Sequence, residues 1–417
     1  MRHWRRHFLV AGIALASLVL GPLAAAENWN DAAAGLARDI ASVTGPGTIA
    51  LSVNNASGLS GADLASIRQA LERHLLGAGL HLADPAGAAS EVEVTFSENL
   101  ESYLWVASIH LGTETRVVMR AVPRKSAPAM AAAGSSVLLR KTLLWSQAAP
   151  ILDAAAISAG NPGAQLLVLD TEKASVLHGS PGHWELDQSL PITHARAFPR
   201  DVRGRLELGG DRLFRAYLPG TACSASATGP FHPSDPTPGL LGTLQMNCQD
   251  TDEPWPLQPG TGQAAAFAAA RNFFTGALEP ALGKQTATAP FYSAAGLPRP
   301  NYTLWLFAGV DGRVRATDGI NEIVLGAASH WGSEIAAVKS ECGTMVLASA
   351  DADDAASDTV RTYEVADREP APSSPALEFP GPVTALWSSS QEGTATAVAH
   401  NLRTNQYEAY SVAVLCP

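Results

Sequence analysis

Carboxylates are the first residues of this chain that could do chemistry. Asp201, Asp311 and Glu334 lie in its C-terminal part, and two carboxylates across a cleft are enough for glycoside hydrolysis. The sequence does not show which two would meet, and isolated acids are more often solvated surface charges. Both interpretations stay open at this stage.

Metal-binding patterns are weak in the sequence. Two acidic clusters lack the bend glycine of a calcium loop; they are Asp250, Asp252 and Glu253, and Asp351, Asp353, Asp354 and Asp358. His178 and His183 flank the turn-rich stretch 179–182, and the chain has neither H-E-x-x-H nor C-x-x-C. We therefore expect no metal site.

Patterns for nucleophiles and phosphate binding are also missing. The chain lacks G-x-S-x-G, and no lysine has a serine three residues before it. Gly260 and Gly262 precede a stretch that could be helical, but no lysine follows where a nucleotide-binding loop needs one. We predict no catalytic residue and no cofactor, although a triad scattered over loops would leave no such pattern.

Two groups of residues favour binding instead. The stretch 194–215 concentrates arginines, among them Arg196, Arg200 and Arg203, whose planar groups suit carboxylates and phosphates. The same arginines could simply pair with neighbouring acids. Proline-rich loops carry Trp255, Phe291 and Tyr292, which would form an exposed partner surface or roof the centre of their domain.

Composition narrows the classes of partner. The chain has 417 residues, with 46% hydrophobic and 16% charged residues and a net charge of −11, which is typical of a globular protein of about two to three domains. An acidic chain argues against nucleic acid or an anionic membrane surface as the main ligand.

The N-terminus has the pattern of an export signal over residues 1–26. Arg2, Arg5 and Arg6 precede an apolar stretch over 8–20 and an alanine-rich cleavage site that ends at Ala26. The stretch is shorter than the ~20 residues that a membrane span needs, so a membrane anchor is the weaker alternative. Arg5 and Arg6 leave Sec and twin-arginine export open. We expect a periplasmic or secreted protein without a transmembrane segment in the mature chain.

Four cysteines agree with an oxidising compartment, and four cysteines allow three pairings. We favour a local disulfide between Cys223 and Cys248, and a long-range one between Cys342 and Cys416.

Residues 27–124 predict a small α/β (α+β) domain. Apolar residues at three- and four-residue steps predict a helix over 61–76, and alternation predicts strands over 48–53, 91–96, 103–111 and 115–122. We expect a sheet with helices on one face and solvent on the other. Residues 125–141 are rich in small residues and proline and predict a linker.

Residues 142–417 predict an all-β propeller. Short apolar runs broken by turn residues recur along this region. Blades of about 40–50 residues would make about six of them. The last unit shows three strands, and 142–147 could supply the fourth, which would place Leu143 and Leu144 beside Tyr410 and close the ring.

A signal peptide, a small α/β domain and then a propeller resemble the periplasmic proteins of the TolB type. The resemblance covers domain order only: Asp311-Gly312 and Asp318-Gly319 lack the proline of the TolB-type turn. The strand rhythm, the closable ends and the absence of any catalytic spacing favour a non-enzymatic envelope protein whose propeller binds a protein partner in the cell envelope or another ligand. The alternative is a secreted hydrolase or lyase with its active site in the propeller mouth.

Overall fold

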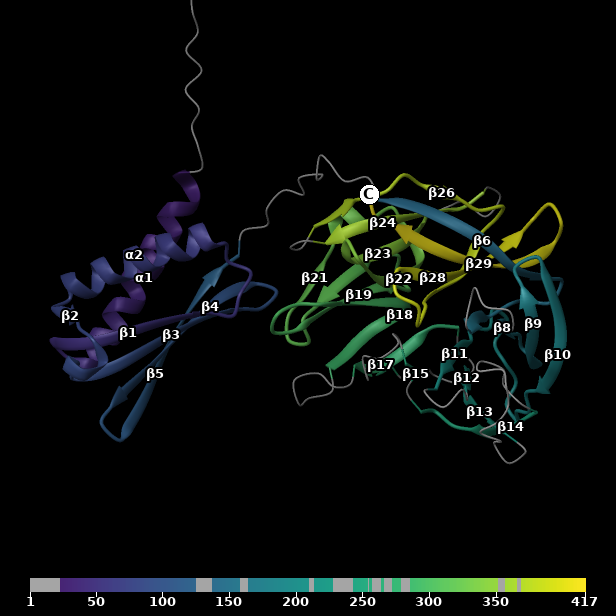
Figure 1. Cartoon of the computed structure of the whole chain (residues 1–417), viewed down its shortest axis with the longest axis horizontal. Coiled ribbons are helices and arrows are strands. Elements are labelled where there is room, and N and C mark those ends of the chain that lie inside the picture. The colour runs from purple at the N-terminus through teal and green to yellow at the C-terminus, as the bar shows by residue number, and fades with distance from the viewer. Residues whose placement is uncertain are drawn as a thin grey trace, which may run out of the picture. The chain divides into compact units, whose positions relative to one another are not determined.

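The computed structural model forms two compact units, an α/β unit (up to residue 98, and 102–123) and a propeller unit (99–101 and from 124 on) (Figure 1). Each is described by itself. The structure describes residues 23–124, 137–157, 164–209, 214–227, 243–253, 255–256, 264–265, 272–278, 286–351, 357–365 and 369–417. Residues 1–22 of the predicted export signal and 125–136 of the predicted linker lie outside these ranges.

The α/β unit is a five-stranded sheet with two helices, in the strand order β2-β1-β3-β4-β5. Strand β1 runs parallel to β2 and β3, and the later neighbours are antiparallel. The elements are α1 Leu23–Thr44, β1 Gly47–Asn55, α2 Gly61–Gly77, β2 Leu80–Leu82, β3 Ser90–Glu98, β4 Ser102–Leu111 and β5 Glu114–Pro123.

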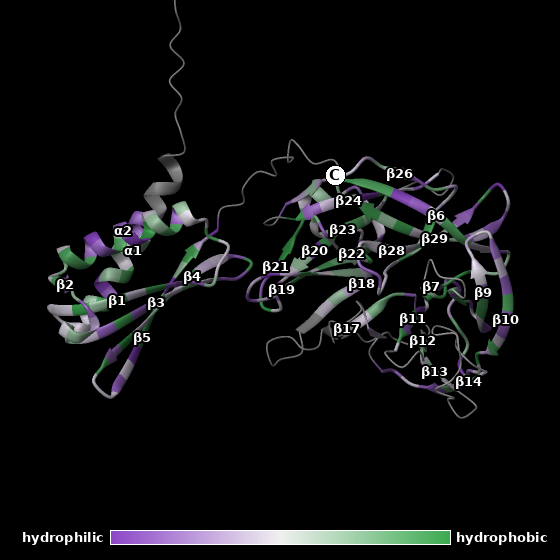
Figure 2. Cartoon of the chain, in the orientation of Figure 1, coloured by the Kyte–Doolittle hydropathy of each residue, from purple (hydrophilic) through white to green (hydrophobic). Residues whose placement is uncertain are grey.

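Local sequence explains these elements. Ser60 caps α2 by accepting a hydrogen bond from the backbone amide of Asp63, 3.1 Å away. The apolar side of α2 is buried through Ile67, Leu71 and Leu75. Hydrophobic and hydrophilic residues alternate along β3 (Figure 2), so that one side of the strand is buried and the other meets solvent. The predicted α/β portion is therefore present.

The propeller unit contains five blades within the described residues. Blade 1 comprises β7 Asp153–Ile157, β8 Ala164–Leu169, β9 Lys173–Ser180 and β10 His183–Pro191. Blade 2 comprises β11 Arg205–Leu208, β12 Phe214–Leu218, β13 Thr221–Ala227 and β14 Leu244–Asp250. Blade 3 comprises β17 Phe274–Leu278, β18 Thr286–Pro298, β19 Thr303–Gly309, β20 Val314–Thr317 and β21 Glu322–Val324.

Blade 4 comprises β22 Trp331–Ser340, β23 Gly343–Ala350, β24 Thr359–Val365 and β25 Pro370–Pro372, with β26 Leu377–Glu378 also paired to β24. Blade 5 comprises β27 Val383–Ser388, β28 Thr394–Asn401, β29 Gln406–Leu415 and β6 Leu138–Gln147.

The expected count of about six blades was wrong, because the part of the chain that the structure describes forms five. Dividing chain length by a typical blade length overestimated the number, since the residues that the structure describes between β14 and β17 contribute only the two-stranded pair β15 Trp255–Pro256 and β16 Ala264–Ala265. Strand β18, with 13 residues, also takes more chain than an average strand.

The ring closes as predicted. Strand β6 pairs antiparallel with β29, and Leu143 lies opposite Tyr410. This pairing joins the first strand of the propeller unit to the last, so β29 is paired on both sides and β6 is the outer edge strand of blade 5. Strand β6 begins at Leu138, so the end of the segment 125–141 belongs to a strand rather than to the linker.

Both disulfides lie in the propeller unit. Cys223 and Cys248 are direct partners on β13 and β14 of blade 2. Cys342 follows β22 of blade 4 and is bonded to Cys416, just after β29 of blade 5. The second disulfide therefore ties two blades together at the closing seam. Among the described residues, no helix is both long and apolar enough for a membrane span.

Candidate functional site on the propeller axis

The first strands of four blades are joined directly at the centre of the propeller. The guanidinium of Arg205 on β11 donates to the carboxylate of Asp153 on β7 and to the carbonyl of Ser388 on β27. The hydroxyl of Ser388 donates in turn to the carbonyl of Ala337 on β22, over 2.7 Å. These strands are therefore the innermost strands of their blades, and their polar groups meet on the axis.

Asp153 and Arg205 form the first buried ion pair of this layer, with 3.2 Å between Oδ2 and Nη1. Asp153 also accepts the backbone amides of Ala154 at 2.8 Å and Leu206 at 2.7 Å. The guanidinium carbon of Arg205 lies 4.9 Å from the ring centre of Trp387. The two side chains are at most 6% exposed, so the pair is withdrawn from solvent.

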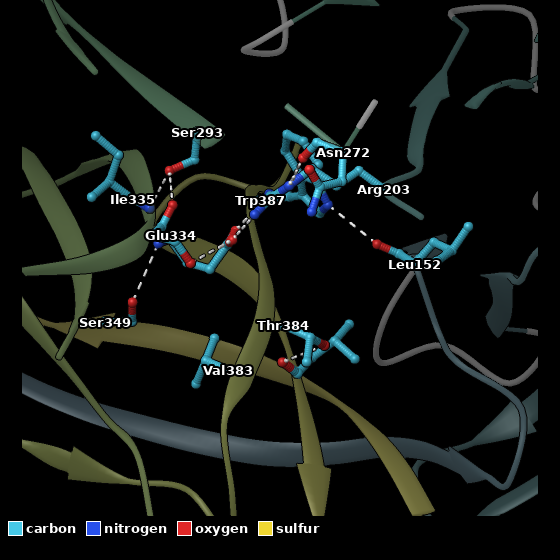
Figure 3. A network of polar contacts seen from close by, with 12 residues as sticks. Leu152, Arg203, Asn272, Ser293, Glu334, Ile335, Ser349, Val383, Thr384 and Trp387 are labelled. Carbon is cyan, nitrogen blue, oxygen red and sulfur yellow. Dashed lines mark hydrogen bonds and ion pairs between the residues drawn. The ribbon is translucent and has the colours of Figure 1, made fainter. Parts of the chain in front are cut away.

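Arg203 and Glu334 form the second buried pair, through two hydrogen bonds of which one measures 3.1 Å (Figure 3). Arg203 Nε donates to the carbonyl of Asn272, just before β17, over 3.1 Å. Its guanidinium also lies 5.4 Å from the ring centre of Tyr292. Through this pair the fifth inner strand is connected to the others.

A bulge in β22 directs Glu334 into the network. The pairing with β23 shifts register between Trp331 and Ile335. Serine hydroxyls replace the missing strand partners: Ser349 accepts the amide of Glu334, and Ser293 accepts the amide of Ile335 at 2.8 Å (Figure 3). A Cβ on Gly332 would lie 2.4 Å from the carbonyl oxygen of Ala350, so the bulge requires glycine there.

Burial dominates the electrostatics of both carboxylates. Removal from water raises the pKa of Asp153 to about 6, against the opposing effect of Arg205. Burial also raises the pKa of Glu334, which Arg203 opposes. Each carboxylate is held by an arginine and by hydrogen bonds, so the arrangement serves to fasten strands rather than to present a free acid or base.

Two cavities lie on opposite sides of this layer. The mouth cavity, about 170 Å³, is lined by Leu152 and Gly204, which directly precede β7 and β11, and by Trp387 of β27. The second cavity, about 80 Å³, is lined by the residues that follow them, from Asp153, Arg205 and Ser388 onward. The ion-pair layer therefore lies at the start of β7 and β11 and at the end of β27, where the lining changes from one cavity to the other.

The rim of the mouth cavity carries the predicted arginines in part. Arg200 and Arg203 both line it, together with Asp201, Thr171 and Tyr407. Arg200 and Asp201 are exposed. Arg196 lies elsewhere, in a surface ion pair with Asp252 at 3.1 Å. Of the three predicted arginines, the structure therefore brings two to one site.

Of the two interpretations of these aromatic residues, burial excludes an exposed partner surface for Trp255 and Phe291. Trp255 is 3% and Phe291 1% exposed. Both pack against Phe274, with ring centres 5.4 and 5.3 Å apart, because such large apolar side chains gain most from burial. Tyr292 is half-buried beneath Arg203. These aromatics belong to the core and its margin, not to a continuous exposed surface.

The remaining candidates are dispersed. Asp311, in the turn between β19 and β20, pairs with Arg315 at 2.6 Å. Glu334 belongs to a different ion pair, with Arg203. His178 lies 3.5 Å from Glu185 at the surface. No group of three metal-binding side chains exists within the described part of the chain. Residues 260–262 and 352–356 lie outside it.

Sequence reasoning missed Asp153, and it included Arg205 only as one arginine of the stretch 194–215. Each stands at the start of a short apolar strand, where a charged residue is ordinary. The available signal is one acid enclosed by apolar residues on both sides, in Ile151-Leu152-Asp153-Ala154. Nothing in the local pattern pairs it with an arginine 52 positions later.

Comparisons with known proteins return solved structures of low identity. No protein-family model matches the chain, and no curated protein matches it. Similar solved structures include the Dos1 propeller (10% identity, TM-score 0.31, covering 75% of this chain and 90% of that one) and TolB from Acinetobacter baumannii (9% identity, TM-score 0.19, covering 88% and 94%). Another is Hsv2 from Kluyvelomyces marxianus (11% identity, TM-score 0.26, covering 60% and 73%). The strand pairing of the chain itself gives, among the described residues, a five-bladed propeller after an α/β unit.

Proposed function

We propose that this chain is an exported, non-enzymatic binding scaffold of the cell envelope, and that a protein partner or ligand binds at the mouth cavity. Two disulfides support an oxidising, extracytoplasmic location. The N-terminal sequence pattern supports export. The mature protein would be periplasmic or secreted.

One observation carries the binding role: the charges on the axis are already paired, whereas a charge on the rim is not. Arg203 is occupied by Glu334 at the bottom of the mouth cavity. Arg200 is exposed on the rim and has no ion pair among the described residues. An exposed arginine beside a concave surface is a common anchor for a partner.

The size of the cavity favours a partner that inserts a small group. A volume of about 170 Å³ is below the ~300 Å³ at which pockets for whole drug-sized ligands begin. The cavity would therefore take one side chain or a ligand of similar size. The apolar walls contributed by Ile151, Leu152 and Ala385 would contact its body, and Arg200 and Asp201 its polar end.

The binding role is tested by comparing two charge reversals in the full chain. Affinity capture from the native envelope, with quantitative mass spectrometry, uses wild type, Arg200→Glu and, as a matched control, Arg313→Glu. Arg313 is exposed in the turn after β19 and does not line the mouth cavity. We expect a defined partner to be lost with Arg200→Glu and retained with Arg313→Glu. An identical captured set for all three proteins would contradict the proposal.

Export is tested separately. The N-terminus of the protein purified from its native host should begin at Glu27, as measured by intact-mass and N-terminal peptide analysis. A protein that retains residues 1–26 in the cytoplasmic fraction would contradict this part of the proposal.

A further inference from the structure

Strand β5 of the α/β unit has one unpaired edge. It pairs with β4 over its whole length, from Ser102 opposite Pro123 to Leu111 opposite Glu114. It stands last in the strand order, so within the described residues no strand pairs with its other edge. Its ten residues make it a long edge, and long edges are templates for pairing with another chain.

The solvent face beside this edge is apolar. Val117 and Met119 are 61% and 60% exposed. Met119 lies opposite Val106 of β4, and Ala121 lies opposite Leu104. The other face of β5 carries Val118 and Val122, which pack with the helices and the sheet core. We call Leu104, Val106, Val117, Met119 and Ala121 the β5 strip.

We propose that a second copy of this chain pairs with β5, antiparallel and about a two-fold axis at Val117. The two five-stranded sheets would join into one continuous sheet. The two β5 strips would meet on the same face, and the helices of both copies would lie on the other. Pairing supplies partners to edge amides and carbonyls, and the strips bury apolar surface.

Charge complementarity selects both the occupant and the register. With Val117 opposite itself, Glu114 of each copy lies opposite Arg120 of the other, which gives two attractive pairs. A two-fold axis at Arg116 would set that residue against itself, and an axis at Val118 would set Arg116 against Arg120. Like charges directly opposite each other destabilise a strand pair, so these registers are disfavoured.

The charged groups near the edge fit this register. Asp39 of α1 holds Arg120 through two hydrogen bonds of 2.6 and 2.9 Å. Glu114 contacts Arg116 in the same strand at 2.6 Å. Both contacts are exposed to solvent, so Glu114 can approach the Arg120 of a second copy without breaking a buried pair.

Sedimentation velocity of the purified full chain over a wide concentration range tests the association. We expect a reversible dimer. Val117→Arg would place two like charges opposite each other at the axis and weaken the dimer roughly tenfold, which corresponds to about 1.4 kcal/mol. Leu186→Arg is the matched control, since Leu186 is 58% exposed on the outer strand of blade 1, and it should leave the dimer unchanged.

Cysteine cross-linking tests the register. All four native cysteines are in disulfides, so an introduced cysteine is the sole free thiol. Val117→Cys should form a linked dimer under mild oxidation, and Leu186→Cys should not. Thr115→Cys mixed with Met119→Cys should also link. A wild-type monomer at every concentration, equal linking by both single variants, or linking of Val117→Cys to a different protein would overturn the proposal.

Discussion

In the α/β unit the ion pairs among the described residues lie at the surface, whereas the propeller buries two of its pairs on the axis. Arg120 and Asp39 are 43% and 32% exposed, and the two side chains of the Arg205–Asp153 pair are 6% and 2% exposed. The space between the two helices and the sheet of the α/β unit can be filled by apolar side chains alone. Five strands converging on an axis bring backbone amides and carbonyls together, and these need polar partners.

The buried charges meet that need. Asp153 accepts two backbone amides, and Arg205 and Arg203 each donate to a backbone carbonyl. The difference between the units indicates that the buried ion pairs hold separate blades together. Their loss should therefore be costly in a way that the loss of a surface pair is not.

The largest effect is expected from Glu334→Ala. It leaves the guanidinium of Arg203, which is 11% exposed, without its carboxylate, so the unfolding free energy should fall by about 3–5 kcal/mol. Urea denaturation measures the change. Glu253→Ala is the control, because Glu253 pairs with Arg215 at the surface, and it should cost at most about 1 kcal/mol. Equal losses in the two variants would erase the distinction between buried and exposed pairs.

Removal of the seam disulfide should have the next largest effect. Replacing both Cys342 and Cys416 by serine frees a bond between residues 74 positions apart, so we expect a loss of about 2–4 kcal/mol. Replacing Cys223 and Cys248, only 25 positions apart, should cost less, because closing a shorter loop restricts the unfolded chain less. Thermal unfolding of both variants decides the order, and the reverse order would argue against the seam as the critical closure.

The folding stability of the propeller unit should depend on pH, and the raised pKa of Asp153 fixes the direction of that dependence. In the folded chain burial raises the pKa of Asp153 from 3.8 to about 6. The folded state therefore binds more protons than the unfolded state between these values. This contribution to stability is complete below about pH 4 and is lost as the pH rises through about 6. Burial raises the pKa of Glu334 in the same direction.

The difference between wild type and Asp153→Asn isolates this contribution. Urea midpoints measured from about pH 4 to about pH 8 should show wild type losing stability relative to the variant as the pH rises. Parallel pH profiles for the two proteins would mean that the carboxyl group of Asp153 does not titrate in this range.

The smallest effect is expected in the α/β unit. Arg68→Ala removes an exposed pair with Glu72 on one face of α2, at 2.8 Å. Such a pair contributes roughly 0.3–0.5 kcal/mol, which hydrogen exchange of the α2 amides should detect as a slight loss of protection. A loss comparable to that of Glu334→Ala would show that surface pairs matter equally.

The sequence allowed the α/β portion, the propeller class and the ring closure to be predicted, because each rests on local periodicity or on chain ends. The alternation in β3 and the helical spacing of Ile67, Leu71 and Leu75 are local signals. No local signal determines the number of blades, because this number depends on how many residues the connections between strands use. Trp255 and Phe291 stand beside proline, so the local pattern indicated loops although the side chains fill the core.

The ion-pair layer on the propeller axis could not be predicted from the sequence, and the reason is physical. Its pairs join residues 52 and 131 positions apart, and a single charged residue at a strand start does not reveal its partner. Of the predicted binding residues, Arg200 and Arg203 meet at the mouth cavity, because they are close in sequence at the entry to one inner strand.

A double-mutant cycle across Asp153 and Arg205 tests the central claim most directly. The unfolding free energies of Asp153→Ala, Arg205→Ala and the double variant measure how strongly the two groups depend on each other. If the ion pair fastens the blades, each single change should cost about 3–5 kcal/mol, and the double change should cost at least about 2 kcal/mol less than their sum. Costs that add within about 0.5 kcal/mol would contradict a fastening ion pair on the propeller axis.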